Sequence, residues 1–227
     1  MNTLDHVQGY FLGLDIGQMQ DFSALTLLAR RIEVPDPLAW DSSMAYSMYY
    51  PVVMRQFDLG TPYYVIEKEV ARIWALPELM ATENWIAVDA TGVGSPIVEN
   101  LRMTHGLPVQ SIIITGGETA KQVGDTEYHV GKEHLVTALV DMVQRKRLII
   151  PEGVDAYDVF FNQLEVFGYK VNKSTGNVSW EAMKEQVHDD VIISVALALW
   201  MAERVHPFRI PEAGGGGSDE RTYDPLG

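Results

Sequence analysis

Three acidic positions in the sequence could together hold divalent metal ions. Asp15 and Asp89 each end a short apolar run, and the pair Asp189 and Asp190 comes directly before a long apolar stretch. Carboxylate oxygens gathered without cysteine favour Mg²⁺ or Mn²⁺ over zinc. Such a cluster repels itself strongly unless a cation neutralises it. The pattern therefore indicates a metal site, in which two ions about 4 Å apart could activate water against a phosphodiester.

Each of these acids also has a purely structural interpretation. A lone aspartate at the end of a strand is most often a turn or cap residue. Asp189 suits the N-cap of a helix, and Asp190 suits its first turn. Asp21 follows Asp15 by six residues, and it could reach the edge of the site as an outer ligand. Spacing alone leaves the catalytic and the structural interpretations open.

Periodicity in the sequence predicts the elements that would carry these acids. Short apolar runs predict buried strands at 10–16, 23–31, 49–59, 85–89, 109–115 and 148–150. Apolar residues at helical spacing predict helices at 62–82 with a break at Pro77, 96–103, 131–147, 155–167 and 189–204. Turn residues predict a loop at 33–47 and a hairpin at 168–180 with its turn at 175–177.

This mixture of strands and helices predicts a three-layer α/β domain with a central mixed sheet. Ligands in such folds bind at the ends of the strands. The acids of distant segments can therefore meet at one edge of the sheet.

Composition sets the limits of this interpretation. The chain has 227 residues, 47% of them apolar, which is enough for one large domain. We expect that domain at 1–210 and a flexible, acidic, Gly-rich tail at 211–227. The net charge of −14 argues against a nucleic-acid binder unless metal ions or a partner domain offset it. The start lacks the basic and apolar regions of a signal peptide, and 191–201 is too short to span a bilayer.

Four segments resemble the nuclease domain of terminase large subunits, the DNA-packaging enzymes of tailed bacteriophages. Its three acidic blocks resemble GLDIGQMQDFSALTLLAR, VDATGVGSPIVENL and HDDVIISVALALW, and the segment between the second and third blocks resembles YHVGKEHLVTALVDMVQRKRLIIP. The resemblance covers roughly residues 9–204. It implies an RNase H-like fold, with the acids on the first strand, a later central strand and a C-terminal helix.

The resemblance also implies a function and roles for the acids. Asp15, Asp89 and Asp190 match the catalytic metal ligands. Asp189 and Asp21 match accessory acids, and whether Asp189 or Asp190 is the closer ligand stays open. The implied enzyme is an endonuclease that uses Mg²⁺ or Mn²⁺, expected as two ions. It would cut concatemeric viral double-stranded DNA during genome packaging, with low sequence specificity.

Substrate contacts and partners follow from the same resemblance. Lys132 matches a basic position of the family and could touch a DNA phosphate, although a solvated helix start is the simpler interpretation. Lys170 and Lys173 in the expected hairpin are further candidates for the DNA backbone. The sequence contains no G-x-x-x-x-G-K-[ST] phosphate loop, so the ATPase domain of the family would be a separate partner. The portal and the small terminase subunit are the other implied partners, in the cytoplasm of an infected bacterium.

Three other functions remain open from the sequence. The GLDIG segment also resembles the first phosphate loop of sugar kinases and actin-like ATPases. A junction resolvase would use a similar set of acids. A non-catalytic module could dock the packaging motor on the portal, with 212–227 as its docking segment.

Overall fold

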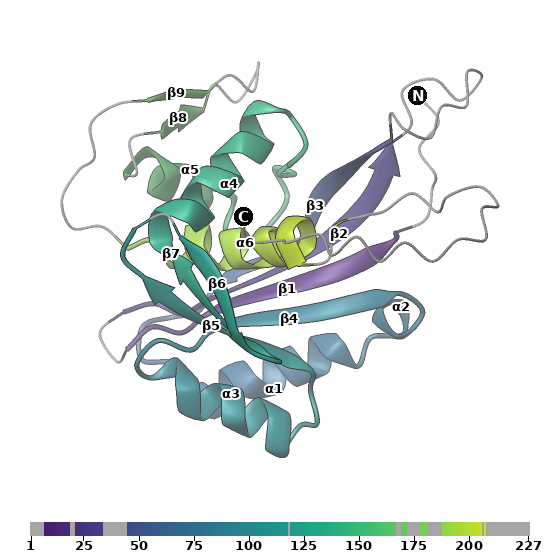
Figure 1. Cartoon of the computed structure of the whole chain (residues 1–227), viewed down its shortest axis with the longest axis vertical. Helices are drawn as coiled ribbons and strands as arrows, with labels where there is room; N and C mark the ends of the chain where they lie inside the picture. Colours follow the sequence, from purple (N-terminus) through teal and green to yellow (C-terminus); the bar gives the residue numbers. More distant parts are fainter. Residues whose placement is uncertain are drawn as a thin grey trace.

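The computed structural model has one mixed sheet of seven strands in the order β3-β2-β1-β4-β5-β7-β6 (Figure 1). The first three strands are antiparallel neighbours, β4, β5 and β7 run parallel to β1, and β6 returns antiparallel to β7. The strands are β1 (Gly9–Asp15), β2 (Ala24–Glu33), β3 (Tyr46–Gln56), β4 (Glu83–Asp89), β5 (Val109–Thr115), β6 (Ala120–Gly124) and β7 (Glu127–Gly131). The structure describes residues 7–18, 21–33, 45–117, 119–166, 169–171, 178–180, 188–205 and 207.

Helices cover both faces of this sheet (Figure 1). Side chains alternate between the two faces of a strand, so Phe11 of β1 packs with α4, α5 and α6, whereas Leu12 and Leu14 pack with α1 and α3. The helices are α1 (Tyr63–Trp74), α2 (Pro77–Met80), α3 (Gly94–Met103), α4 (Lys132–Gln144), α5 (Tyr157–Val166) and α6 (Asp190–Trp200). The predicted three-layer α/β class with a central mixed sheet is confirmed.

The predicted break in the helix at 62–82 is also confirmed. The first helix ends at Trp74, and Pro77 starts the short helix α2. Proline lacks an N–H and is tolerated only in the first turn of a helix. The chain therefore has to leave one helix before Pro77 and can begin the next one there.

The strand predicted at 148–150 is wrong. Leu148 forms a single bridge with Tyr49, held by one hydrogen bond from Tyr49 N to Arg147 O and one from Ile149 N to Tyr49 O. Pro151 follows and has no N–H to donate. The pairing therefore stops after one bridge.

The sequence interpretation missed β6 and β7. Strand β7 alternates buried Tyr128 and Val130 with exposed Glu127 and His129, which is the pattern of a half-buried strand. Strand β6 has almost no buried side chains, so its sequence carries no apolar run. Together they extend the sheet beyond β5.

Several predictions meet the boundary of the described residues. The hairpin at 168–180 is present as β8 (Tyr169–Val171) paired with β9 (Val178–Trp180). Its turn at 175–177, most of the loop at 33–47 and the tail at 211–227 lie outside the described residues. The last helix continues past α6 as a π-helix, η2 (Met201–Val205), rather than as the expected α-helix. In the described part of the chain, no helix is long and apolar enough to cross a membrane.

Candidate active site

The first two acids meet at one edge of the sheet. Asp15 is the last residue of β1, and Asp89 is the last residue of β4. These strands are parallel neighbours, with Leu14 paired to Val88. The two carboxylates therefore leave the same edge side by side, as the sequence predicts.

All five of the predicted acids line one hollow at this edge, with a volume of about 650 Å³. The β1–β2 turn, the end of β4 and the start of α6 form its wall. Its lining residues are Asp15, Ile16, Gly17, Gln18, Asp21, Phe22, Asp89, Thr91, Val93, His188, Asp189 and Asp190. The structure thus gathers the acids, although Asp21 stands at the exposed rim.

A glycine in β1 allows α6 to reach this edge. A Cβ atom on Gly13 would lie 1.9 Å from the carbonyl oxygen of Ser194 and 2.8 Å from the amide nitrogen of Ala198. The backbone of α6 therefore rests directly on the strand. Beside it, the Thr26 and Ser194 hydroxyls are 2.8 Å apart and hydrogen bonded. The sequence analysis missed Gly13, although a glycine inside a strand can mark a close backbone approach.

Two glutamine amides hold the carboxylate of Asp190. Gln56 at the end of β3 donates to Asp190 Oδ2 at 2.8 Å, and Gln163 of α5 donates to Asp190 Oδ1 at 3.3 Å. Asp190 and Gln163 are each 4% exposed. Neither glutamine was singled out from the sequence, because nothing in the residues around Gln56 or Gln163 links them to the acids.

Lys132 lies at the acid cluster. Its ammonium group forms an ion pair with Asp189, and its charge lowers the pKa of both Asp15 and Asp89. Lys132 is the first residue of α4, and its side chain is 45% exposed. The simpler interpretation, a lysine at a solvated helix start, is therefore incomplete. Strand β8 includes Lys170, whose side chain is not described, and Lys173 lies outside the described residues.

Three carboxylates of the cluster, those of Asp15, Asp89 and Asp190, are unusually hard to ionise. Burial and the neighbouring charges of Asp89, Asp189 and Asp190 raise the pKa of Asp15 well above its ordinary value. Burial raises the pKa of Asp89 against its hydrogen bonds from Thr91, and burial raises the pKa of Asp190 against its bond from Gln56. Low dielectric and like charge both disfavour the ionised forms. A bound cation would relieve this repulsion.

The residues fit Mg²⁺ or Mn²⁺ by chemistry, because the donors are all hard oxygens. In the described residues, no three acidic or histidine side chains already stand close enough to enclose an ion. At the third acidic locus, Asp190 accepts hydrogen bonds from two glutamine amides and Asp189 pairs with Lys132.

These pKa shifts predict how the stability of the metal-free protein depends on pH. For Asp15, Asp89 and Asp190 the pKa is higher in the folded state than in the unfolded state. Their contribution to stability is thus full below the unfolded pKa and is lost as the pH rises through the folded values. We expect the melting temperature in EDTA to fall as the pH rises from about 4, the ordinary aspartate value, towards neutral pH, and saturating Mn²⁺ to reduce that fall. A melting temperature that rises across this range would contradict the prediction.

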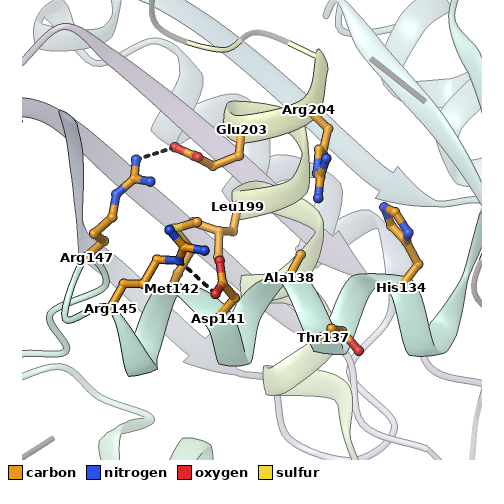
Figure 2. A pocket seen from close by; sticks show the side chains of 10 residues that line it. All are labelled: His134, Thr137, Ala138, Asp141, Met142, Arg145, Arg147, Leu199, Glu203 and Arg204. Atoms are coloured by element: carbon orange, nitrogen blue, oxygen red, sulfur yellow. Dashed lines mark hydrogen bonds and ion pairs between the residues drawn. The ribbon is translucent and has the colours of Figure 1, made fainter. Parts of the chain in front are cut away.

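A second hollow, of about 620 Å³, lies between α4 and η2 and does not contain these acids (Figure 2). Arg145 pairs with Asp141 at 2.8 Å, and Arg147 pairs with Glu203 at 3.0 Å. These ion pairs engage four of the charged side chains that line the hollow. The acid hollow is therefore the better candidate for chemistry.

Comparison with solved structures shows which known proteins share this fold. No family model and no curated protein sequence matches the chain. The human cytomegalovirus terminase nuclease domain, in a Mn-soaked and inhibitor-bound structure, matches 91% of this chain and 88% of its own at 12% identity and a TM-score of 0.52. The chain has the terminase nuclease fold.

Phage structures of the terminase nuclease fold match as well. The large terminase nuclease of thermophilic phage G20c is 23% identical over 86% of this chain and 81% of its own, with a TM-score of 0.49. The nuclease domain of the large terminase g2p from bacteriophage SPP1, with bound Mn, is 13% identical over 84% of each chain, with a TM-score of 0.42. The expected RNase H-like architecture is confirmed: a mixed sheet flanked by helices, with acids on β1, β4 and α6.

Proposed function

We propose that this chain is a metal-dependent endonuclease that cuts concatemeric viral double-stranded DNA during genome packaging. One observation carries the proposal: Asp15, Asp89, Asp189 and Asp190 line a single hollow at the edge of a sheet with the terminase nuclease fold. The Mn-soaked structure of the cytomegalovirus domain supports the choice of metal. An ATPase domain, the portal and the small terminase subunit are the proposed partners.

In this proposal Asp15, Asp89 and Asp190 hold the ions, and Asp189 joins them once it leaves Lys132. Divalent ions there would supply charge neutralisation and Lewis acidity for the attack of water on a phosphodiester. Asp15 and Asp89 stand at the ends of β1 and β4. The rigid sheet therefore fixes two of the carboxylates, which favours a preorganised site. Asp21, exposed at the rim, would act as an outer acid.

DNA would approach an acidic protein, since the chain carries a net charge of −14. Lys132, released from Asp189, could bind a phosphate beside the cleavage site, and Lys170 and Lys173 are proposed as weaker contacts. Phosphate contacts carry no sequence information. They would give low specificity and an affinity that falls with salt. A basic surface on the ATPase partner would strengthen the binding.

Plasmid cleavage tests the proposed function. We expect the protein to nick and linearise plasmid DNA with Mn²⁺ or Mg²⁺ and to be inactive in EDTA, because the carboxylates alone supply no electrophile. A four-way junction should be cut no faster than linear duplex of the same length. Preference for the junction would indicate a resolvase, and ATP binding would indicate the kinase-like alternative. Folded protein that binds no Mn²⁺ would leave only the docking module.

A further inference from the structure

The carboxylate of Asp190 accepts hydrogen bonds from side chains of two other elements. Gln56 reaches it from the end of β3, and Gln163 reaches it from α5. Each glutamine donates to a different oxygen of the carboxylate, to Oδ2 at 2.8 Å and to Oδ1 at 3.3 Å. The side chain of Asp190 therefore has both of its oxygens restrained by protein donors.

Gln163 has a second function at the same place. Its amide oxygen Oε1 accepts hydrogen bonds from Val191 N at 2.9 Å and Ile192 N at 3.1 Å. These are two of the backbone N–H groups that the first turn of a helix leaves without partners. Asp189, at the N-cap position, makes no capping hydrogen bond through its side chain. One buried amide thus caps α6 with its oxygen and holds Asp190 with its nitrogen.

Gln56 contacts the acid without capping the helix. It ends β3 at the same sheet edge as Asp15, since Gln56 is paired with Ala24 and Ala24 with Asp15. The two glutamines approach Asp190 from different elements. Together they restrain it relative to the sheet on one side and to α5 on the other.

We propose that Gln56 and Gln163 are positioning residues that hold Asp190 as a metal ligand of the active site. This inference rests on the proposed function. Groups that hydrogen bond to a metal-ligating side chain orient it, and removing one such group typically weakens metal binding about 10–100-fold. A donor amide also stabilises the ionised carboxylate, which is the form that binds a cation.

Methionine substitutions separate positioning from folding. Methionine keeps nearly the length and volume of glutamine and removes its polar atoms. We expect Gln56→Met and Gln163→Met each to raise the dissociation constant for Mn²⁺ by about tenfold or more, measured by titration calorimetry. Of the two variants, only Gln163→Met should also lower the metal-free melting temperature, by a few degrees, because only Gln163 caps α6.

Gln110→Met is the matched control. Gln110 is 7% exposed near the start of β5, away from the acid edge, so its replacement should leave Mn²⁺ affinity unchanged. Mn²⁺ affinities within about twofold of wild type in both test variants would overturn the inference. If Gln163→Met does not fold, Gln56→Met decides alone. Wild-type protein that binds no Mn²⁺ would overturn the proposed function, and this inference with it.

Discussion

Replacing Asp15 with asparagine is expected to abolish DNA cleavage while stabilising the metal-free protein. Asp15 stands beside Asp89, and the charges of Asp89, Asp189 and Asp190 all raise its pKa. Asparagine keeps the shape and removes the charge. In the proposed metal site, this substitution removes one metal ligand and also reduces the like-charge repulsion of the metal-free protein, so it should disable the chemistry and raise stability together.

The expected sizes of the effects on cleavage rate and melting temperature follow from the two roles of the Asp15 charge. Losing several kcal/mol of metal-dependent stabilisation slows cleavage by about a thousandfold or more. At a pH above the raised pKa of Asp15, the metal-free melting temperature should increase by about 2 °C or more. In a domain of this size, 1 kcal/mol corresponds to about 2–4 °C. Plasmid cleavage with Mn²⁺ and thermal melts in EDTA measure the two effects.

Asp125→Asn is the control for the change of charge. Asp125 is exposed in the turn between β6 and β7, so the variant should cut DNA and melt like the wild type. If Asp15→Asn cuts DNA at the wild-type rate, the catalytic assignment is wrong. If it loses activity but melts at a lower temperature than the wild type in EDTA, the repulsion inferred for the cluster is wrong.

Replacing Gly13 with alanine is expected to be the most destabilising small substitution in the sheet. The new Cβ would lie 1.9 Å from Ser194 O and 2.8 Å from Ala198 N. Both atoms belong to the backbone of α6, so no rotamer change can make room and the whole helix has to shift. Overpacking of this kind costs about 3 kcal/mol or more, which lowers the melting temperature by about 6–12 °C.

The same shift should reach the active site, because Asp190 begins α6. We therefore expect Gly13→Ala to weaken Mn²⁺ binding although Gly13 touches no ligand. Adding Ser194→Gly should not restore stability, since the clash is with the main chain. Gly153→Ala is the control, because a Cβ there meets nothing within 4 Å. A Gly13→Ala protein as stable as the Gly153→Ala protein would contradict the proposed packing.

The sequence predicted the acids better than it predicted their surroundings. Asp15 and Asp89 each end an apolar run, and apolar runs become buried strands whatever the rest of the chain does. That local rule was enough to place them at a sheet edge. The single bridge at Leu148 and the missed strands β6 and β7 show its limit, because pairing there depends on which strand lies alongside.

The glycines of the second acidic block illustrate the same boundary. From the sequence, Gly92 and Gly94 could simply form a tight turn between strand and helix. Gly92 does adopt a φ of +59°, which favours glycine. Gly94 serves another purpose: a Cβ there would lie 1.8 Å from the carbonyl oxygen of Asp89. The first residue of α3 therefore has to be a glycine for the helix to pack this closely against the end of β4.

The sequence by itself determined the set of acids, the α/β class and most of the elements, because residue type and periodicity act over a few neighbouring positions. The tertiary structure decided how the acids are held. Gln163 lies 27 residues and Gln56 134 residues from Asp190, and Lys132 pairs with Asp189 across the fold. Such contacts form only when α5, α4 and β3 pack around α6, and hydrogen bonds between distant residues leave no periodic trace in a single sequence.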